Sequence, residues 1–176
     1  MTSERVPPAP LRKRQIAVDA SPPGSPPDDG DVGELLDVPR LAQVAYSSEA
    51  PGHPVDHLFD GANGPAGSRW VADRPDQPQR LELAFDAPQR ITRIRLEAAE
   101  AEAERTQQVC VRVSRDGGRT YEELRRQEYT FSPGGATYQH EDWAVDLHGV
   151  THLRLDVVPN LRGHGSASFV SLQLYR

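Results

Sequence analysis

The sequence predicts an all-β protein: an antiparallel β-sandwich of the jelly-roll type, preceded by a disordered N-terminal tail. Two observations predict the sandwich. Hydrophobic and polar residues alternate through most of the second half of the chain, and short runs rich in glycine and proline separate the alternating segments. A third predicts the tail, because residues 1–32 contain seven prolines and almost no large hydrophobic side chains. Such a segment buries too little apolar surface to offset the conformational entropy lost on ordering.

Residues 33–176 are expected to form one folded domain. The chain has 176 residues in total, which suits one domain and a tail. About 140 residues bury roughly two thirds of the surface that the unfolded chain exposes, enough for a single core. Lys13 is the only lysine, and arginine, alanine and proline are abundant, which is typical of a GC-rich bacterial genome.

Each expected strand places hydrophobic side chains on one face and polar side chains on the other. In residues 81–86, for example, Leu81, Leu83 and Phe85 share one face. This alternation is typical of a half-buried strand in an antiparallel sheet. It recurs in five further segments: residues 91–97, 107–114, 141–147, 151–158 and 168–175. In the third of these, Trp143 alternates in phase with Val145 and Leu147, so we expect its ring in the core.

Turn-forming residues separate the expected strands. The Asp-Gly-Gly run at residues 116–118 predicts a tight hairpin, because such turns need residues that adopt a positive φ. Residues 97–108 have a helix-forming composition but no apolar face beyond alanine, so we expect a strand end followed by a loop there. The other expected turns are at residues 86–90, 132–137, 147–150 and 159–165.

The composition argues against several classes of function. The formal net charge is -6, whereas nucleic-acid binding needs a concentrated positive field. No run of about 18 apolar residues is present to span a membrane, and the loops offer few apolar or basic side chains for binding a membrane surface. One cysteine, Cys110, and a start without a secretory signal favour a cytoplasmic protein.

The sequence contains no recognisable catalytic constellation. His140, Glu141 and Asp142 are consecutive, but neighbours on a strand point to opposite faces and cannot converge on one metal ion. Cys110 shares a face with Arg112, which would suit a reactive thiolate, although a small strand residue is the favoured interpretation. We therefore expect no enzymatic activity.

The glycine-rich segment HLFDGANGPAGSRW, residues 57–70, is the most conspicuous candidate for a ligand loop. A phosphate-binding loop would need a lysine directly after its last glycine and a helix behind it, and both are missing. The G-x-x-G-x-x-G spacing also differs from that of a dinucleotide-binding loop. Phosphate binding is therefore rejected.

The order of these elements resembles that of the discoidin, or coagulation factor type C (F5/8 type C), domain, a galactose-binding-like jelly roll. The resemblance covers residues 38–176. Five segments carry it, namely VAYSSEAPGHPVDHLFDG, SRW, LELAFDAPQRITRIRLE, VRVSRDGGRTYEEL and SASFVSLQLYR.

The resemblance implies that the glycine-rich loop could hold a structural calcium ion. Asp60 and Ser68 fall at ligand positions of the family, and Asn63 offers a further oxygen. The acidic residue that the family carries on its last strand is replaced by Ser171, so we expect weak calcium binding, on the order of millimolar, or none. In the favoured alternative Asp60 caps a turn by accepting backbone N–H groups, and no cofactor is required.

The resemblance also implies a non-catalytic binding module that holds a galactose-like carbohydrate in loops at one end of the sandwich. The candidate loops are residues 49–57, 71–79 and 159–165. Trp70 is either a core anchor or a platform for a sugar ring, and both interpretations are kept. The candidate ligand contacts are His53, Asp56, Trp70, Arg74, Arg162 and His164.

A second function stays open, that of an intracellular protein-interaction domain of the same fold, tethered by its tail. The basic cluster LRKRQ, residues 11–15, is either a solvated charge run or a docking peptide for an acidic partner. We expect a glycan or a protein as the partner, no nucleic acid or membrane, and a monomer or part of a larger assembly.

Overall fold

A computed structural model describes residues 9–15 and 33–176, and it confirms the predicted all-β class. Two short helices are present in these residues, α1 (Val38–Leu41) and the 3-10 helix η1 (Val55–Phe59). Neither has the length or hydrophobicity that crossing a lipid bilayer would require. The strands are β1 (Arg12–Gln15), β2 (Ala42–Tyr46), β3 (Trp70–Val71), β4 (Gln79–Ala99), β5 (Arg105–Ser114), β6 (Glu122–Phe131), β7 (Tyr138–Gly163), β8 (Ser168–Phe169) and β9 (Ser171–Tyr175).

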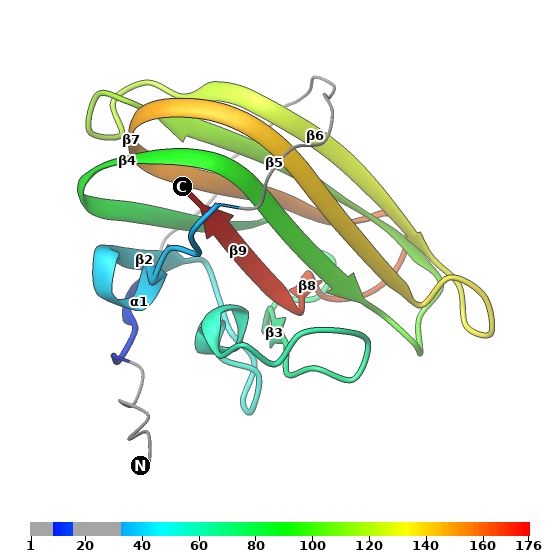
Figure 1. Ribbon diagram of the computed structural model, residues 1–176. Coiled ribbons are helices and arrows are strands. Elements are labelled where there is room, and N and C mark those ends of the chain that lie inside the picture. The colour runs from blue at the N-terminus through cyan, green and yellow to red at the C-terminus, as the bar shows by residue number, and fades with distance from the viewer. Residues whose placement is uncertain (1–8, 16–32) are drawn as a thin grey trace, which may run out of the picture.

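Two long strands, β4 and β7, join the layers of the sandwich. The main sheet has the order β1-β2-β4-β7-β5-β6, and β9 also pairs with β4. The first half of β4 pairs with β2 and the second half of β7, whereas its second half pairs with β9 and the first half of β7. Both strands curve strongly between their halves and so belong to both layers (Figure 1).

The sequence analysis was wrong about two of the turns and partly wrong about a third. In the third, residues 159–163 form the end of β7 and only residues 164 and 165 lie beyond the strand. Residues 86–90 and 147–150 are bends within β4 and β7, marked by register shifts, and they do not end the strands. Pro88 lacks an N–H group and Gly149 adopts a φ of 67°, so each interrupts the hydrogen-bond ladder locally and lets the strand turn into the other layer. The hairpin at residues 116–118 is confirmed.

The core lies between the layers and follows the predicted alternation. Leu81 and Leu83 on β4 are each 2% exposed. Trp143 is also buried, as predicted, and its ring lies 5.4 Å from the guanidinium of Arg125 on β6. This contact joins the first half of β7 to the opposite layer.

Part of the expected tail is ordered against the domain. Residues 1–8 and 16–32 lie outside the described residues, but Arg12–Gln15 form β1, which pairs with β2 in parallel. The prediction of disorder through residue 32 is therefore wrong for these four residues. Composition did not reveal this strand, because its stabilising contacts are with β2 and with acidic side chains far along the chain, such as Glu49.

Candidate functional site

Three loops that were expected to bind a ligand lie side by side at one end of the sandwich. The Val71 N–H donates to the His53 carbonyl (3.3 Å), and the Ala72 N–H donates to the Ala167 carbonyl (2.8 Å). The Asp76 N–H donates to the Gly165 carbonyl (3.0 Å). Backbone hydrogen bonds therefore connect the predicted ligand loops in a ladder.

Asp76 holds the loop at residues 159–165 in place. Its carboxylate accepts hydrogen bonds from the Gly165 N–H (2.8 Å), the Asn160 amide (3.0 Å) and His164 Nδ1 (3.2 Å). These donors, the Gly165 N–H above all, lower the pKa of Asp76. Because Nδ1 of His164 is engaged, Nε2 is the ring nitrogen that a ligand would meet. Asp76 was not selected from the sequence, although its φ of 59° marks the special conformation of this loop.

Arg105 supports the same loop from beneath. Its side chain is fully buried and donates to the Gln107 side chain (2.9 Å), the Pro159 carbonyl (2.9 Å) and the Ser168 hydroxyl (3.0 Å). Burial lowers the pKa of Arg105. A Cβ at Gly165 would lie 2.9 Å from Arg105 Cδ, so a side chain at this position would collide with Arg105. Arg105 was not selected from the sequence.

Two clefts lie at this end. The larger, about 370 Å³, is lined by His53, His57 and Arg69 together with residues 65–68. His57 Nδ1 lies 3.0 Å from the Arg69 carbonyl and donates to it. His57 and Arg69 were not selected from the sequence, because only the folded loop brings them beside His53.

The smaller cleft, about 340 Å³, is lined by Arg162, Arg105, Thr106 and Thr130. Arg162 is exposed at the end of β7, opposite Thr106 of β5. The two clefts thus contain two of the predicted contacts, His53 and Arg162.

Residues 43–171 match the model of the F5/8 type C domain family. The chain belongs to this family. The resemblance noted in the sequence is thereby confirmed over most of residues 38–176. Among curated proteins, no sequence matches this F5/8 type C domain.

Solved structures share its fold. The family 32 CBM of NanJ from Clostridium perfringens, in complex with galactose, has a TM-score of 0.54 and 14% identity, with 77% of this chain and 93% of that chain covered. The CBM32-1 and CBM32-2 domains of Clostridium perfringens ZmpB, in complex with GalNAc, have a TM-score of 0.59 and 14% identity. The match covers 81% of this chain and 36% of that chain. SpGH29 has a TM-score of 0.53 and 19% identity. The match covers 77% of this chain and 26% of that chain, so this domain spans about a quarter of SpGH29.

Of two further predicted contacts of this F5/8 type C domain, Trp70 is not positioned to meet a ligand and Asp56 already has an ion-pair partner. Trp70 is 0% exposed, stacks on Phe169 at 6.2 Å between ring centroids, and donates from Nε1 to the Ser48 carbonyl (3.0 Å). The core interpretation is confirmed and the platform interpretation is wrong, because a sugar needs an exposed ring face. Asp56 is held by the Lys13 ammonium at 2.6 Å.

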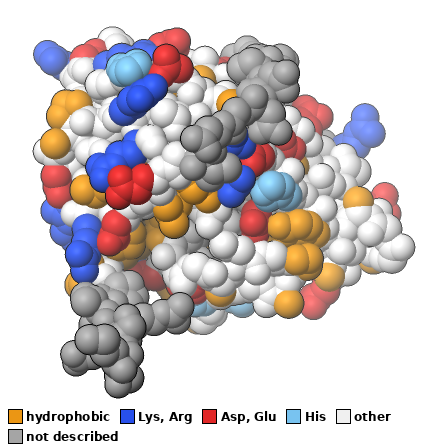
Figure 2. All heavy atoms as spheres, viewed as in Figure 1, with side chains coloured by type: hydrophobic (Ala, Val, Ile, Leu, Met, Phe, Trp, Pro, Cys, Tyr) orange, Lys and Arg blue, Asp and Glu red, His pale blue; other side chains and the backbone are white. Residues whose placement is uncertain are grey.

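Arg74 and His164 remain at the surface of this F5/8 type C domain. Both side chains are exposed, Arg74 on the loop after β3 and His164 on the loop after β7. On the face shown in Figure 2, basic and acidic side chains are interspersed and do not form one area of a single sign.

Hydrogen bonds within the glycine-rich loop, residues 57–70, close it. Asp60 accepts from the Ala62 N–H (2.8 Å) and from the Ser68 hydroxyl. A Cβ on Gly67 would lie 2.0 Å from the Ala62 carbonyl oxygen, so only glycine fits at this position without moving the backbone. Asp60 and Ser68 are brought together as predicted, and the contacts of Asp60 fit its interpretation as a turn cap.

A second carboxylate at this loop comes from β4. Glu97 is 7% exposed and accepts a hydrogen bond from the Gly64 N–H (2.7 Å). Its register partner on β9 is Ser171, the position where an acid was expected from the family. Glu97 could not be selected from the sequence, because only the pairing of β4 with β9 places it there.

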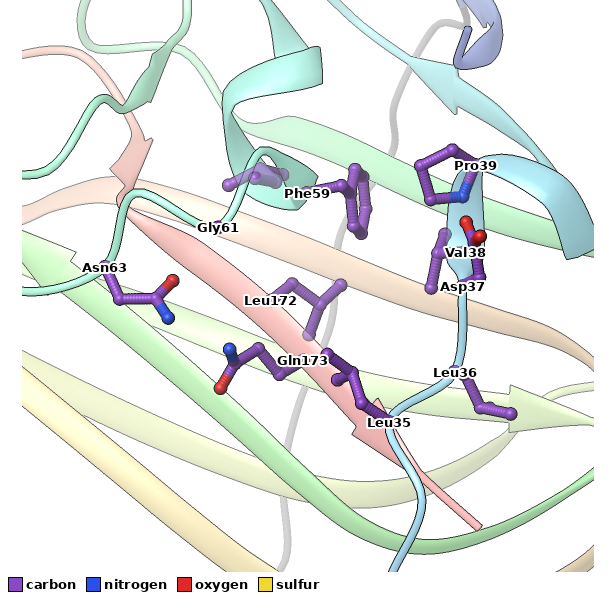
Figure 3. A pocket seen from close by; sticks show the side chains of 11 residues that line it. Leu35, Leu36, Asp37, Val38, Pro39, Phe59, Gly61, Asn63, Leu172 and Gln173 are labelled. Atoms are coloured by element: carbon purple, nitrogen blue, oxygen red, sulfur yellow. The ribbon is translucent and has the colours of Figure 1, made fainter. Parts of the chain in front are cut away.

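Asn63 lies at a third cleft, which is largely apolar and has a volume of about 300 Å³. Figure 3 shows its side chain pointing toward β9, where Leu172 and Gln173 lie. Leu35, 52% exposed, and Phe59 line the same cleft.

Cys110 is a buried strand residue and not a reactive thiol. It is 3% exposed, and its Sγ donates to Glu123 Oε2 at 3.0 Å. Burial raises the pKa of Cys110 to about 11, so the thiolate is scarce at neutral pH. In residues 9–15 and 33–176, no three His, Cys, Asp or Glu side chains are grouped to bind a metal ion.

Proposed function

We propose that this F5/8 type C domain is a non-catalytic carbohydrate-binding module, which binds a galactose-like sugar through His53, Arg162 and His164. The observation that carries the proposal is the convergence of three loops at one end of the sandwich, with exposed or half-buried donors beside two clefts. The CBMs of similar fold that were solved with galactose and GalNAc support the same ligand class.

The loops favour weak but selective recognition of hydroxyl groups. Guanidinium and imidazole groups donate hydrogen bonds in fixed directions, which suits pairs of sugar hydroxyls. Asp76 orients His164, and Arg105 anchors the backbone at Pro159. These groups are therefore ordered before the sugar binds, and less conformational entropy is lost on binding. No exposed aromatic platform is needed in this arrangement.

Calorimetry with galactosides and a glycan array test the proposal. We expect the Arg162→Ala and His53→Ala variants each to lose affinity by about tenfold or more, which corresponds to ~1.4 kcal/mol. The matched control is Arg90→Ala, because Arg90 is an exposed arginine in the bend of β4. An absence of binding across broad glycan classes would contradict the proposal.

The second candidate, a protein-interaction domain, is favoured by the apolar cleft beside Leu35 (Figure 3). Exposed apolar clefts are typical of protein-docking surfaces. Pull-downs with the full chain and with a chain lacking residues 1–32 distinguish the candidates. Recovery of one specific protein only when the tail is present supports this alternative, and an empty pull-down weakens it.

We further propose that the glycine-rich loop needs no calcium ion. Asp60 accepts two hydrogen bonds and Glu97 accepts one, so both carboxylates have partners without a cation, whereas Ca²⁺ prefers six to eight oxygen ligands. We expect the unfolding midpoint to be the same in EDTA and in millimolar CaCl₂, with MgCl₂ as the control. A rise that is specific to calcium and absent in Glu97→Gln would show that the loop holds the ion.

A further inference from the structure

The outer edge of β2 is occupied by a strand from the far N-terminus. Arg12 pairs with Gln43 and Gln15 pairs with Tyr46, in parallel, while β4 pairs with the other edge of β2. Without β1 this edge would present unpaired N–H and C=O groups. Main-chain hydrogen bonds to such an edge are a common way to bind an extended peptide, and side-chain pockets then select its sequence.

Lys13 is seated in a side-chain site beside that edge. Its ammonium lies 2.6 Å from Asp56 Oδ2 and 3.0 Å from Glu49 Oε1, and 5.6 Å from the centroid of the Tyr46 ring. The Lys13 side chain is 28% exposed. Two carboxylates and an aromatic face together form a recognition site for an ammonium group.

Neighbouring residues of β1 add further contacts. The Arg12 guanidinium pairs with the Asp86 carboxylate, and the Gln15 amide donates to the Ser47 carbonyl. Leu11 packs against the hydrophobic core. Arg14, by contrast, is exposed, so the contacts favour particular positions and not basic charge in general.

We propose that the edge of β2, with Glu49 and Asp56, is a binding site for an extended basic segment, that the chain's own Arg12–Gln15 is its occupant, and that Lys13 is the anchor. The acidic partner of the basic cluster is thus this domain itself. This inference goes beyond carbohydrate binding and does not depend on it.

Occupation of the site also steadies a ligand loop. Glu49, which holds Lys13, accepts a hydrogen bond from the Val55 N–H (2.9 Å) and another from the Tyr46 hydroxyl (3.3 Å). Lys13 therefore bridges the start of the loop at residues 49–57 and η1. His53 lies between these anchor points.

Hydrogen exchange on the full chain tests the proposal. We expect Lys13→Glu to accelerate exchange at the β2 amides that face β1 and at Val55, on the order of tenfold, which corresponds to about 1.4 kcal/mol. Arg14→Glu, which makes the same charge change at the exposed position, should leave these amides unchanged. Equal effects of the two substitutions, or no effect of either, would overturn the proposal.

A disulfide trap tests the register and the origin of the occupant. Arg12→Cys with Gln43→Cys places thiols at exposed register partners, and we expect an intrachain disulfide in the monomer. Arg14→Cys with Gln43→Cys is two residues out of register and should react far more slowly. Disulfide-linked dimers, or equal rates for both pairs, would overturn the intrachain assignment. Neither experiment involves a glycan, so its outcome is separate from that of the carbohydrate proposal.

Discussion

Replacing Arg105 with methionine is expected to lower the free energy of unfolding by about 3–5 kcal/mol, because removing one member of a buried, hydrogen-bonded charge network leaves its partners unsatisfied. Those partners are the Glu100 carboxylate, which lies 3.3 Å from Nε, the Gln107 side chain, the Pro159 carbonyl and the Ser168 hydroxyl. Urea unfolding followed by tryptophan fluorescence measures the loss, since Trp70 and Trp143 are both buried.

The matched control for this variant is Arg90→Met. Arg90 pairs with Asp146, and their side chains are 57% and 70% exposed, so the loss should stay below about 1 kcal/mol. If the two variants were equally stable, Arg105 would not be the anchor of the loop. If only Arg105→Met lowers the unfolding free energy, the side chain that anchors the candidate ligand loop also stabilises the whole fold.

Trp70→Ala is expected to cost about 3–5 kcal/mol of unfolding free energy, as large-to-small changes of a buried aromatic ring do. The variant removes the stacking on Phe169 and leaves the Ser48 carbonyl without its indole donor. Trp70→Phe retains a ring and should cost less. Thermal or urea unfolding with Trp143 as the remaining reporter distinguishes the three proteins.

A platform role for Trp70 would give the opposite pattern. Glycan affinity would then fall in Trp70→Ala while the unfolding free energy stayed unchanged, because an exposed ring contributes little to the core. The complete burial of the ring predicts a loss of stability instead.

The candidate site combines surface groups that could contact a ligand with two supporting residues, of which Arg105 is buried and Asp76 is exposed. His53, Arg162 and His164 are the groups that a sugar would meet, whereas Asp76 and Arg105 set the course of the loops that carry them. Surface groups can be exchanged at small cost to the fold, but Arg105 cannot, because its partners would be left buried and unsatisfied. Substitutions of the surface groups should therefore change glycan affinity, whereas substitution of Arg105 should change the unfolding free energy.

The sequence by itself determined which residues face inward. Alternation along residues 81–86 or 151–158 is a local property of a strand, since successive side chains point to opposite faces, and the burial of Leu81, Leu83 and Leu153 follows it. The hairpin at residues 116–118 was predictable for the same reason, because its glycines meet a local need for positive φ. The family resemblance placed the three ligand loops at one end.

Only the tertiary structure decided which side chains meet. Glu97 lies opposite Ser171 because β4 pairs with β9, and Lys13 meets Asp56 because β1 docks beside β2. Such contacts depend on the register between segments that are far apart in the chain, and alternation within one segment carries no information about that register. The burial of Arg105 is a contact of this kind, which is why the strongest support of the site could not be recognised from its sequence position.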